Sequence, residues 1–192
     1  MTARARPGSV GLIGLGLIGS ALAERLLGAG QHVVGWDRDP VRRAALQQSG
    51  GEVAEGGPDV FALCRRVLLS LPSHREVAAV VQAARPSLRQ GLTIIDTTTG
   101  DPAHSEKLAG DLAGDGITLY GDRRCGGASS ATRCGQALQQ CGACLQNCGP
   151  GIGSDRGIGC NACSIDIALS NHLGLAGRVN SVINPICHSA RR

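Results

Sequence analysis

An α/β fold, with a doubly wound parallel sheet and an irregular Gly/Cys-rich tail, is predicted by three features of the sequence. Apolar runs typical of buried strands alternate with segments of helical periodicity along residues 1–122. A glycine-rich turn joins the first apolar run to the first helical segment. Beyond this point the alternation stops, and eight of the nine cysteines lie in residues 123–192. We therefore expect an ordered α/β domain over 1–122 and a divergent tail over 123–192.

Each predicted element rests on a local pattern. The strands are short runs of Val, Ile and Leu that end in Gly, Pro or Asp. The helices show apolar residues three and four positions apart, and some begin at a proline. The predicted strands cover 9–15, 31–37, 67–71, 92–96 and 116–120, and the predicted helices cover 18–27, 41–48, 58–65, 76–84 and 102–112. Because the two kinds of element alternate, we expect a sheet of the Rossmann type.

The glycine-rich turn has the spacing of a phosphate-binding loop. It consists of Gly14, Leu15, Gly16, Leu17, Ile18 and Gly19. Gly14 permits a tight turn, Gly16 allows the backbone to approach a pyrophosphate, and Gly19 lets the helix pack closely on the strand. The free N–H groups at the start of the helix favour negative charge. The turn therefore predicts a binding site for NAD or NADP.

Asp37 closes the second predicted strand, 18 residues beyond Gly19, where this fold places a ribose-binding acid. Its carboxylate is expected to accept hydrogen bonds from the hydroxyl groups of the adenosine ribose, which favours NAD. Arg38 follows directly and is suited to stack on adenine or to contact a 2′-phosphate. NADP therefore stays open as the alternative cofactor.

An ordered series of motifs extends from residue 9 to about residue 122. The series comprises the stretches Val10–Gly19, Leu26–Gln31, Asp37–Pro40, Leu69–Pro72 followed by Val77 and Val80, and Ile95–Pro102. In this order the motifs resemble the cofactor half of the β-hydroxyacid dehydrogenase family, which includes 3-hydroxyisobutyrate dehydrogenases and tartronate semialdehyde reductases. The resemblance implies an NAD(P)-dependent oxidoreductase that transfers a hydride between nicotinamide and a small 3-hydroxy acid or semialdehyde. It also implies a homodimer.

The resemblance further implies roles for particular residues. Leu71 and Pro72 would lie along the cofactor at the end of a strand, and Thr99 would lie near the nicotinamide. Gly126 and Gly127 match the glycines of a Ser-Gly-Gly motif that holds the substrate carboxylate. Read without the resemblance, Pro72 would simply end a strand, and the threonines before Gly100 would precede a helix.

The chain departs from the family pattern after residue 121. The family reads Asp-Ala-Pro-Val-Ser-Gly-Gly there, whereas residues 122–127 read Asp-Arg-Arg-Cys-Gly-Gly, one residue shorter and without the serine. GC-rich codons for Ala-Pro-Val would give Arg-Arg-Cys if they were read one base late. We therefore hypothesise that the coding frame was disturbed at this point. The family's acid/base lysine also has no counterpart in the corresponding region. Arg156 lies there, but an arginine stays protonated and is a poor acid/base. Lys107 falls on a predicted surface of the cofactor domain. The catalytic residues are therefore unassigned.

The cysteines of the tail suggest a second hypothesis, a bound zinc ion. Cys141 and Cys144 form one Cys-x-x-Cys pair, and Cys160 and Cys163 form another, 15 residues further on. This spacing is typical of a zinc ribbon, which would make the protein a zinc-stabilised structural protein. The opposing interpretation is that these cysteines are incidental, because the family resembled here has no metal site in this region.

Composition narrows the classes of partner. The formal net charge is only +4, and the chain has no basic run, which argues against a nucleic-acid partner. No apolar run reaches the roughly 18 residues that a membrane span needs. The glycines among the first apolar residues argue against a signal peptide, so we expect a cytoplasmic protein. Three functions stay open: the dehydrogenase, a catalytically inactive NAD(P)-binding module, and the zinc-stabilised protein.

Overall fold

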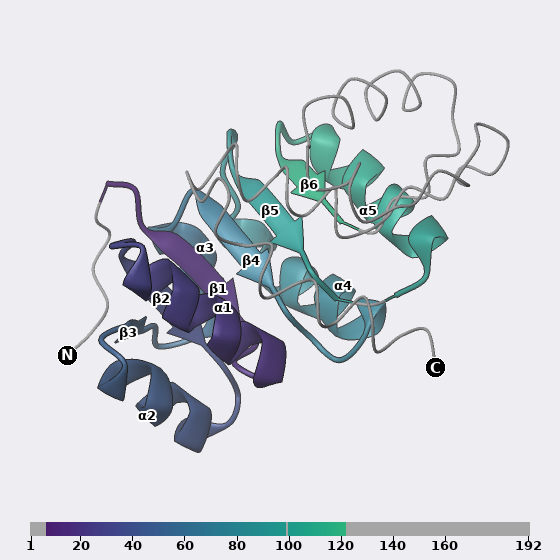
Figure 1. Ribbon diagram of the computed structural model, residues 1–192. Coiled ribbons are helices and arrows are strands. Elements are labelled where there is room, and N and C mark those ends of the chain that lie inside the picture. Colours follow the sequence, from purple (N-terminus) through teal and green to yellow (C-terminus); the bar gives the residue numbers. More distant parts are fainter. Residues whose placement is uncertain (1–6, 99, 122–192) are drawn as a thin grey trace, which may run out of the picture. The chain divides into compact units, whose positions relative to one another are not determined.

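The computed structural model describes residues 7–98 and 100–121, which form a parallel sheet with helices on both faces (Figure 1). The sheet has six strands in the order β3-β2-β1-β4-β5-β6. The strands are β1 (Val10–Ile13), β2 (Val33–Trp36), β3 (Glu52–Val53), β4 (Arg66–Leu69), β5 (Thr93–Asp96) and β6 (Thr118–Tyr120). Every pair of neighbours is parallel. The strand order runs outward from β1 to β3 on one side and from β4 to β6 on the other, which is the arrangement of a Rossmann fold.

The helices of the described residues connect successive strands. They are α1 (Leu17–Gly28), α2 (Pro40–Gln48), α3 (Gly57–Leu63), α4 (His74–Ala83) and α5 (Pro102–Ala113), with a short 3₁₀ turn, η1 (Arg85–Ser87), after α4. Side chains cap three of them: Asp39 accepts a hydrogen bond from the N–H of Val41, Ser73 from that of Arg75, and Asp101 from that of Ala103. Polar residues just before these three helices therefore fix where each of them begins.

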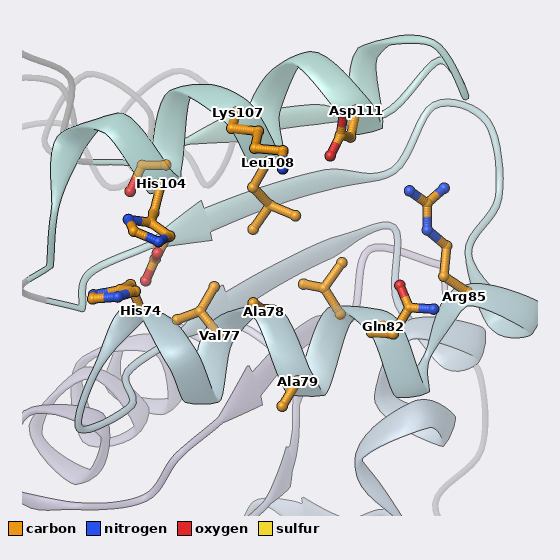
Figure 2. Close-up of a pocket in the computed structure, with 13 residues that line it drawn as sticks. His74, Val77, Ala78, Ala79, Gln82, Arg85, His104, Lys107, Leu108 and Asp111 are labelled. Carbon is orange, nitrogen blue, oxygen red and sulfur yellow. The ribbon is translucent and has the colours of Figure 1, made fainter.

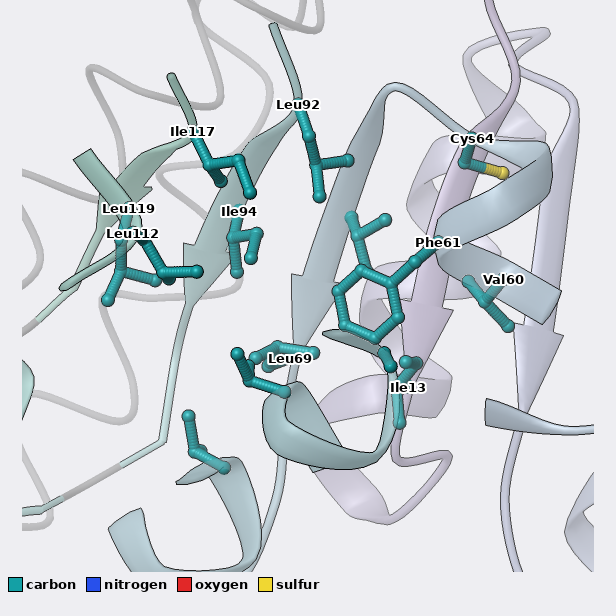
Figure 3. Packing of buried hydrophobic residues seen from close by; sticks show 14 of the residues in the cluster. Ile13, Val60, Phe61, Cys64, Leu69, Leu92, Ile94, Leu112, Ile117 and Leu119 are labelled. Atoms are coloured by element: carbon teal, nitrogen blue, oxygen red, sulfur yellow. The ribbon is translucent and has the colours of Figure 1, made fainter. Parts of the chain in front are cut away.

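The main hydrophobic core lies between the sheet and helices α3, α4 and α5. Figure 3 shows Phe61 of α3 among Ile13 of β1 and Leu69 of β4, with Leu112 of α5 beside Ile94 of β5. Leucine, isoleucine and valine dominate this cluster, because the chain has a single Phe, a single Trp and a single Tyr. The clustered side chains are nearly all buried, as expected for strands covered on both faces.

Cys64 belongs to the same core. Its side chain is buried, and this burial raises the pKa of the thiol to about 12. The thiol therefore stays protonated at neutral pH and packs as a small apolar group. It takes no part in the site described below.

The structure confirms the predicted fold class and every predicted helix and strand within the described residues. Two elements were missed, the two-residue strand β3 and the turn η1, because both are too short to show a hydrophobic period. No helix in residues 7–98 and 100–121 is long and apolar enough to cross a membrane. Thr99 and the tail beyond residue 121 lie outside the described residues, so the boundary near 122 stays a prediction.

Candidate functional site

The glycine-rich turn connects β1 to α1 at the carboxyl edge of the sheet. Gly14 adopts a φ of +91°, and a Cβ atom there would lie 2.1 Å from the backbone oxygen of Ser70. The N–H of Gly14 donates to the carbonyl oxygen of Trp36 at 3.0 Å. The turn is thus held between the ends of β2 and β4, in a conformation that excludes any side chain at Gly14.

The start of α1 is open to a ligand. Gly16 is the N-cap residue, no side chain caps the helix, and its first turn has no acidic residue. A Cβ atom on Gly19 would lie 1.9 Å from the backbone oxygen of Gly14, so only glycine lets the helix approach the turn this closely. The N–H groups of the first turn therefore face the end of the sheet with a partial positive charge, which is suited to bind a phosphate.

Asp37 lies directly after β2 and is 6% exposed. Its Oδ2 accepts a hydrogen bond from the N–H of Leu15 at 2.7 Å, and its Oδ1 accepts one from the N–H of Asp39 at 2.9 Å. An ionised carboxylate offers about four acceptor positions, so two hydrogen bonds leave capacity for ribose hydroxyl groups. Asp37 therefore both shapes the glycine turn and presents an acceptor beside it.

Two arginines of α2 lie close to Asp37. Arg42 places Nη1 3.6 Å from Oδ2 of Asp37 and Nε 3.5 Å from Oδ2 of Asp39. Arg43 donates from Nη1 to the carbonyl oxygen of Asp37 at 2.5 Å. The arginines hold the end of β2 in place and bring positive charge to the rim of the site.

A pocket of about 510 Å³ joins the turn, the end of β2 and the end of β4. The sequence-predicted residues that line it are Gly14, Gly16, Leu17, Ile18, Asp37, Arg38, Leu71 and Pro72. Leu15 and Gly19 lie behind this surface, where Leu15 hydrogen-bonds Asp37 and Gly19 contacts Gly14. The remaining predicted residues, Thr99, Gly126 and Gly127, lie outside the described residues.

Sequence reasoning missed several residues of this pocket. These are Trp36, Arg42, Ser70, Glu76 and Val80. Two of them carried a signal that went unused: Arg42 is three residues beyond the capping Asp39, and Ser73-x-x-Glu76 is a capping box at the start of α4. Trp36 and Ser70 directly precede the predicted residues Asp37 and Leu71, and Val80 lies one helical turn beyond Glu76 on α4.

A hydrogen-bonded clamp links the ends of β4 and β5. Oγ1 of Thr98 accepts from the N–H of Leu71 at 3.1 Å, and Oδ1 of Asp96 accepts from the N–H of Thr98 at 2.9 Å. Thr97 adds two hydrogen bonds to the carbonyl oxygen of Leu69, from its N–H and its Oγ1, each of 2.9 Å. Asp96 and Thr98 are buried, so the Leu71-Pro72 wall of the pocket rests on a fixed polar support.

A second hollow of about 470 Å³ separates α4 from α5 (Figure 2). At one end the rings of His74 and His104 lie 4.3 Å apart, and Asp101 is 3.2 Å from Nδ1 of His104. The N–H of Ala103 and then His104 hold the pKa of Asp101 below its usual value. Lys107 is exposed on α5 at the rim, as expected for a surface residue.

No metal centre is visible within the described ranges, where no three His, Cys, Asp or Glu side chains come together. The four cysteines of the predicted zinc ribbon, Cys141, Cys144, Cys160 and Cys163, lie outside those ranges. The zinc hypothesis therefore stays a prediction from the sequence.

Known proteins are similar to this chain in sequence over most of the described domain. Residues 9–149 match the family described as the NAD binding domain of 6-phosphogluconate dehydrogenase. The chain is 30% identical over 129 residues to mitochondrial 3-hydroxyisobutyrate dehydrogenase of Rattus norvegicus, covering 66% of this chain and 38% of that protein. It is 34% identical over 121 residues to a glycerol-3-phosphate dehydrogenase (NAD(P)+) of Yersinia pestis, covering 56% of this chain and 35% of that protein. The chain thus spans less than half the length of these relatives.

Solved structures agree on the fold. A 3-hydroxyisobutyrate dehydrogenase of Mycobacterium tuberculosis, solved with L-serine, superposes with a TM-score of 0.58 at 22% identity, covering 66% of this chain and 44% of that one. An imine reductase of Streptomyces aurantiacus superposes with a TM-score of 0.55 at 28% identity, covering 58% and 39%. The chain therefore belongs to the family described as the NAD binding domain of 6-phosphogluconate dehydrogenase.

Proposed function

We propose that this chain binds NAD in preference to NADP and acts in hydride transfer between nicotinamide and a small 3-hydroxy acid or its semialdehyde. The observation that carries the cofactor preference is the buried Asp37 beside the uncapped start of α1. A carboxylate at this position accepts from ribose hydroxyl groups and repels a 2′-phosphate. The 3-hydroxy acid class is supported by the 30% identity to the rat enzyme.

The residues present fit a dinucleotide. The first N–H groups of α1 would bind the pyrophosphate, since Gly16 leaves room for it and no side chain caps them. Asp37 would orient the adenosine ribose, and Leu71 with Pro72 would form an apolar wall that excludes water. The bound cofactor would supply the hydride acceptor or donor. Gly126 and Gly127 would hold the substrate carboxylate, and no residue is assigned to transfer the proton.

Binding and turnover test the proposal separately. Trp36 is the only tryptophan and lines the pocket, so NADH is expected to quench its fluorescence. A dehydrogenase assay with 3-hydroxyisobutyrate and glycerate then tests hydride transfer. Binding without turnover would identify an inactive NAD(P)-binding module, which the missing lysine favours as the second candidate. A full-length chain that binds neither NADH nor NADPH would contradict both functions.

The Thr98 clamp gives a prediction about cofactor affinity. Replacing Thr98 with valine keeps the shape of the side chain but removes the acceptor for the N–H of Leu71. We expect NADH to bind about fivefold more weakly, because the Leu71-Pro72 wall loses its support. Fluorescence titration measures the change. Thr98→Ser, which keeps the hydroxyl group, is the control and should bind as the wild type does; equal weakening of both variants would count against the clamp.

A further inference from the structure

Helix α4 contributes to the lining of the pocket that also contains the glycine turn. Glu76 and Val80 are one helical turn apart and both line the pocket, together with Leu71 and Pro72. Val80 and Leu71 make this part of the lining apolar, and Glu76 is the only charged residue that α4 contributes to it. This part of the lining thus combines an apolar surface with a single carboxylate, which suits an aromatic ring that carries a hydrogen-bond donor.

Glu76 is held in place by the start of its own helix. The hydroxyl group of Ser73 donates to Oε2 of Glu76, and Oγ of Ser73 accepts from the N–H of Arg75. The hydrogen bond from Ser73, followed by one from the backbone N–H of Glu76, lowers the pKa of the carboxyl, with smaller contributions from Arg38 and Arg75. The group is therefore an oriented carboxylate at neutral pH, and two donors leave part of its acceptor capacity free.

Arg38 brings a positive charge to the same pocket. It follows Asp37 at the end of β2, is exposed, and lines the same hollow as Glu76. Its positive charge contributes to the lowered pKa of the Glu76 carboxyl. A planar guanidinium stacks well on aromatic faces. The lining of the pocket therefore includes a cation that can stack on a ring, apolar side chains and a carboxylate acceptor.

The order of the binding groups along the pocket predicts where the base of a bound dinucleotide lies. Phosphate belongs at the start of α1 and ribose at Asp37, so the base attached to that ribose lies beyond Asp37, toward Arg38 and α4. The carboxylate of Asp37 already accepts hydrogen bonds from the N–H groups of Leu15 and Asp39, and its remaining acceptor positions are assigned to the ribose in the proposed binding mode. Glu76 is the other carboxylate of the pocket within the described residues.

We propose that Glu76 is the residue that selects adenine, by accepting a hydrogen bond from its exocyclic amino group. This inference rests on the proposed binding of the dinucleotide in this pocket. A purine that carries a carbonyl oxygen at that position, as hypoxanthine does, would place an acceptor against the carboxylate. The loss of a charged hydrogen bond and the repulsion between the two oxygens both disfavour the hypoxanthine dinucleotide.

Glu76→Gln is the variant that separates recognition from folding. A glutamine keeps the capping box, because its amide oxygen still accepts from Ser73. Its amide can also donate, so it accommodates a carbonyl oxygen as well as an amino group. The full chain and the variant are titrated with NADH and with reduced nicotinamide hypoxanthine dinucleotide, followed by the fluorescence of Trp36. Glu106→Gln, an exposed position on α5, is the matched control for the loss of one negative charge.

The wild type and the Glu106→Gln variant are expected to bind NADH about tenfold more tightly than the hypoxanthine analogue. In the Glu76→Gln variant this ratio should fall to about one, and the melting temperature should fall only slightly, because the neutral amide accepts a weaker hydrogen bond from Ser73 than the carboxylate does. A wild-type ratio near one, or a ratio that Glu76→Gln leaves unchanged, would overturn the role of Glu76 while leaving cofactor binding intact. Failure of the wild type to bind either dinucleotide would overturn the proposed function itself, and the base selection with it.

Discussion

Replacing Gly14 with alanine is expected to abolish dinucleotide binding and to lower the free energy of unfolding by about 3 kcal/mol or more. Two independent constraints act on this position. Its φ of +91° strains any residue with a side chain, and the added Cβ would lie 2.1 Å from the backbone oxygen of Ser70. Ser70 cannot move aside easily, because its N–H donates to the carbonyl oxygen of Ile13 at 2.9 Å. The turn would have to open, and the first N–H groups of α1 would leave their positions.

Gly28→Ala is the matched control for this variant. Gly28 ends α1, and a Cβ atom there meets no other atom within 4 Å. Alanine should be neutral or slightly stabilising at a helical position of this kind. Chemical denaturation measures the stability of both variants, and the fluorescence of Trp36 measures NADH binding. A Gly14→Ala protein that folds and binds like the Gly28→Ala protein would show that the turn tolerates a side chain.

The fold could be predicted from the sequence because local patterns and tertiary structure agree over most of the domain. The apolar runs that contain β1, β4 and β5 are buried on both faces, and such runs are easy to recognise. The predicted first strand, 9–15, extended too far, since Gly14 leaves the strand with a positive φ. The strand β3 shows no pattern of its own, because pairing with Val34 and Gly35 of β2 alone defines it.

The site was predictable where backbone geometry determines it. The spacing of Gly14, Gly16 and Gly19 encodes a turn and a helix start, and Asp37 follows from its place at the end of a strand. Side chains that arrive from elsewhere in the chain are harder to predict, because a local motif such as the Ser73-x-x-Glu76 capping box does not show which cavity its residues line. Glu76 lines the same pocket as the glycine turn although about 60 residues separate them, and Thr98 supports Leu71 across a sequence separation of 27 residues. Contacts of this kind depend on packing, which local sequence patterns do not report.

Replacing Asp37 with alanine is expected to weaken NAD binding about 100-fold, because two charged hydrogen bonds to the ribose would be lost. The variant should also be less stable by about 1–3 kcal/mol, since the N–H of Leu15 loses a buried acceptor at 2.7 Å. Titration with NADH and chemical denaturation measure the two effects. Asp111→Ala, an exposed position on α5 outside the pocket, should leave both unchanged.

The ratio of NADH to NADPH affinity separates the two roles of Asp37. Distortion of the glycine turn would weaken both cofactors equally, since both place the same pyrophosphate at the start of α1. The two cofactors differ at the ribose. In the wild type the 2′-phosphate of NADPH is repelled by the charge of Asp37. In the Asp37→Ala variant that charge is gone, and the phosphate meets only the positive charges of Arg38 and Arg42. The variant should therefore lose much of its preference for NADH. An equal loss of affinity for the two cofactors would show that Asp37 acts only as a support for the turn, and that another residue sets the cofactor preference.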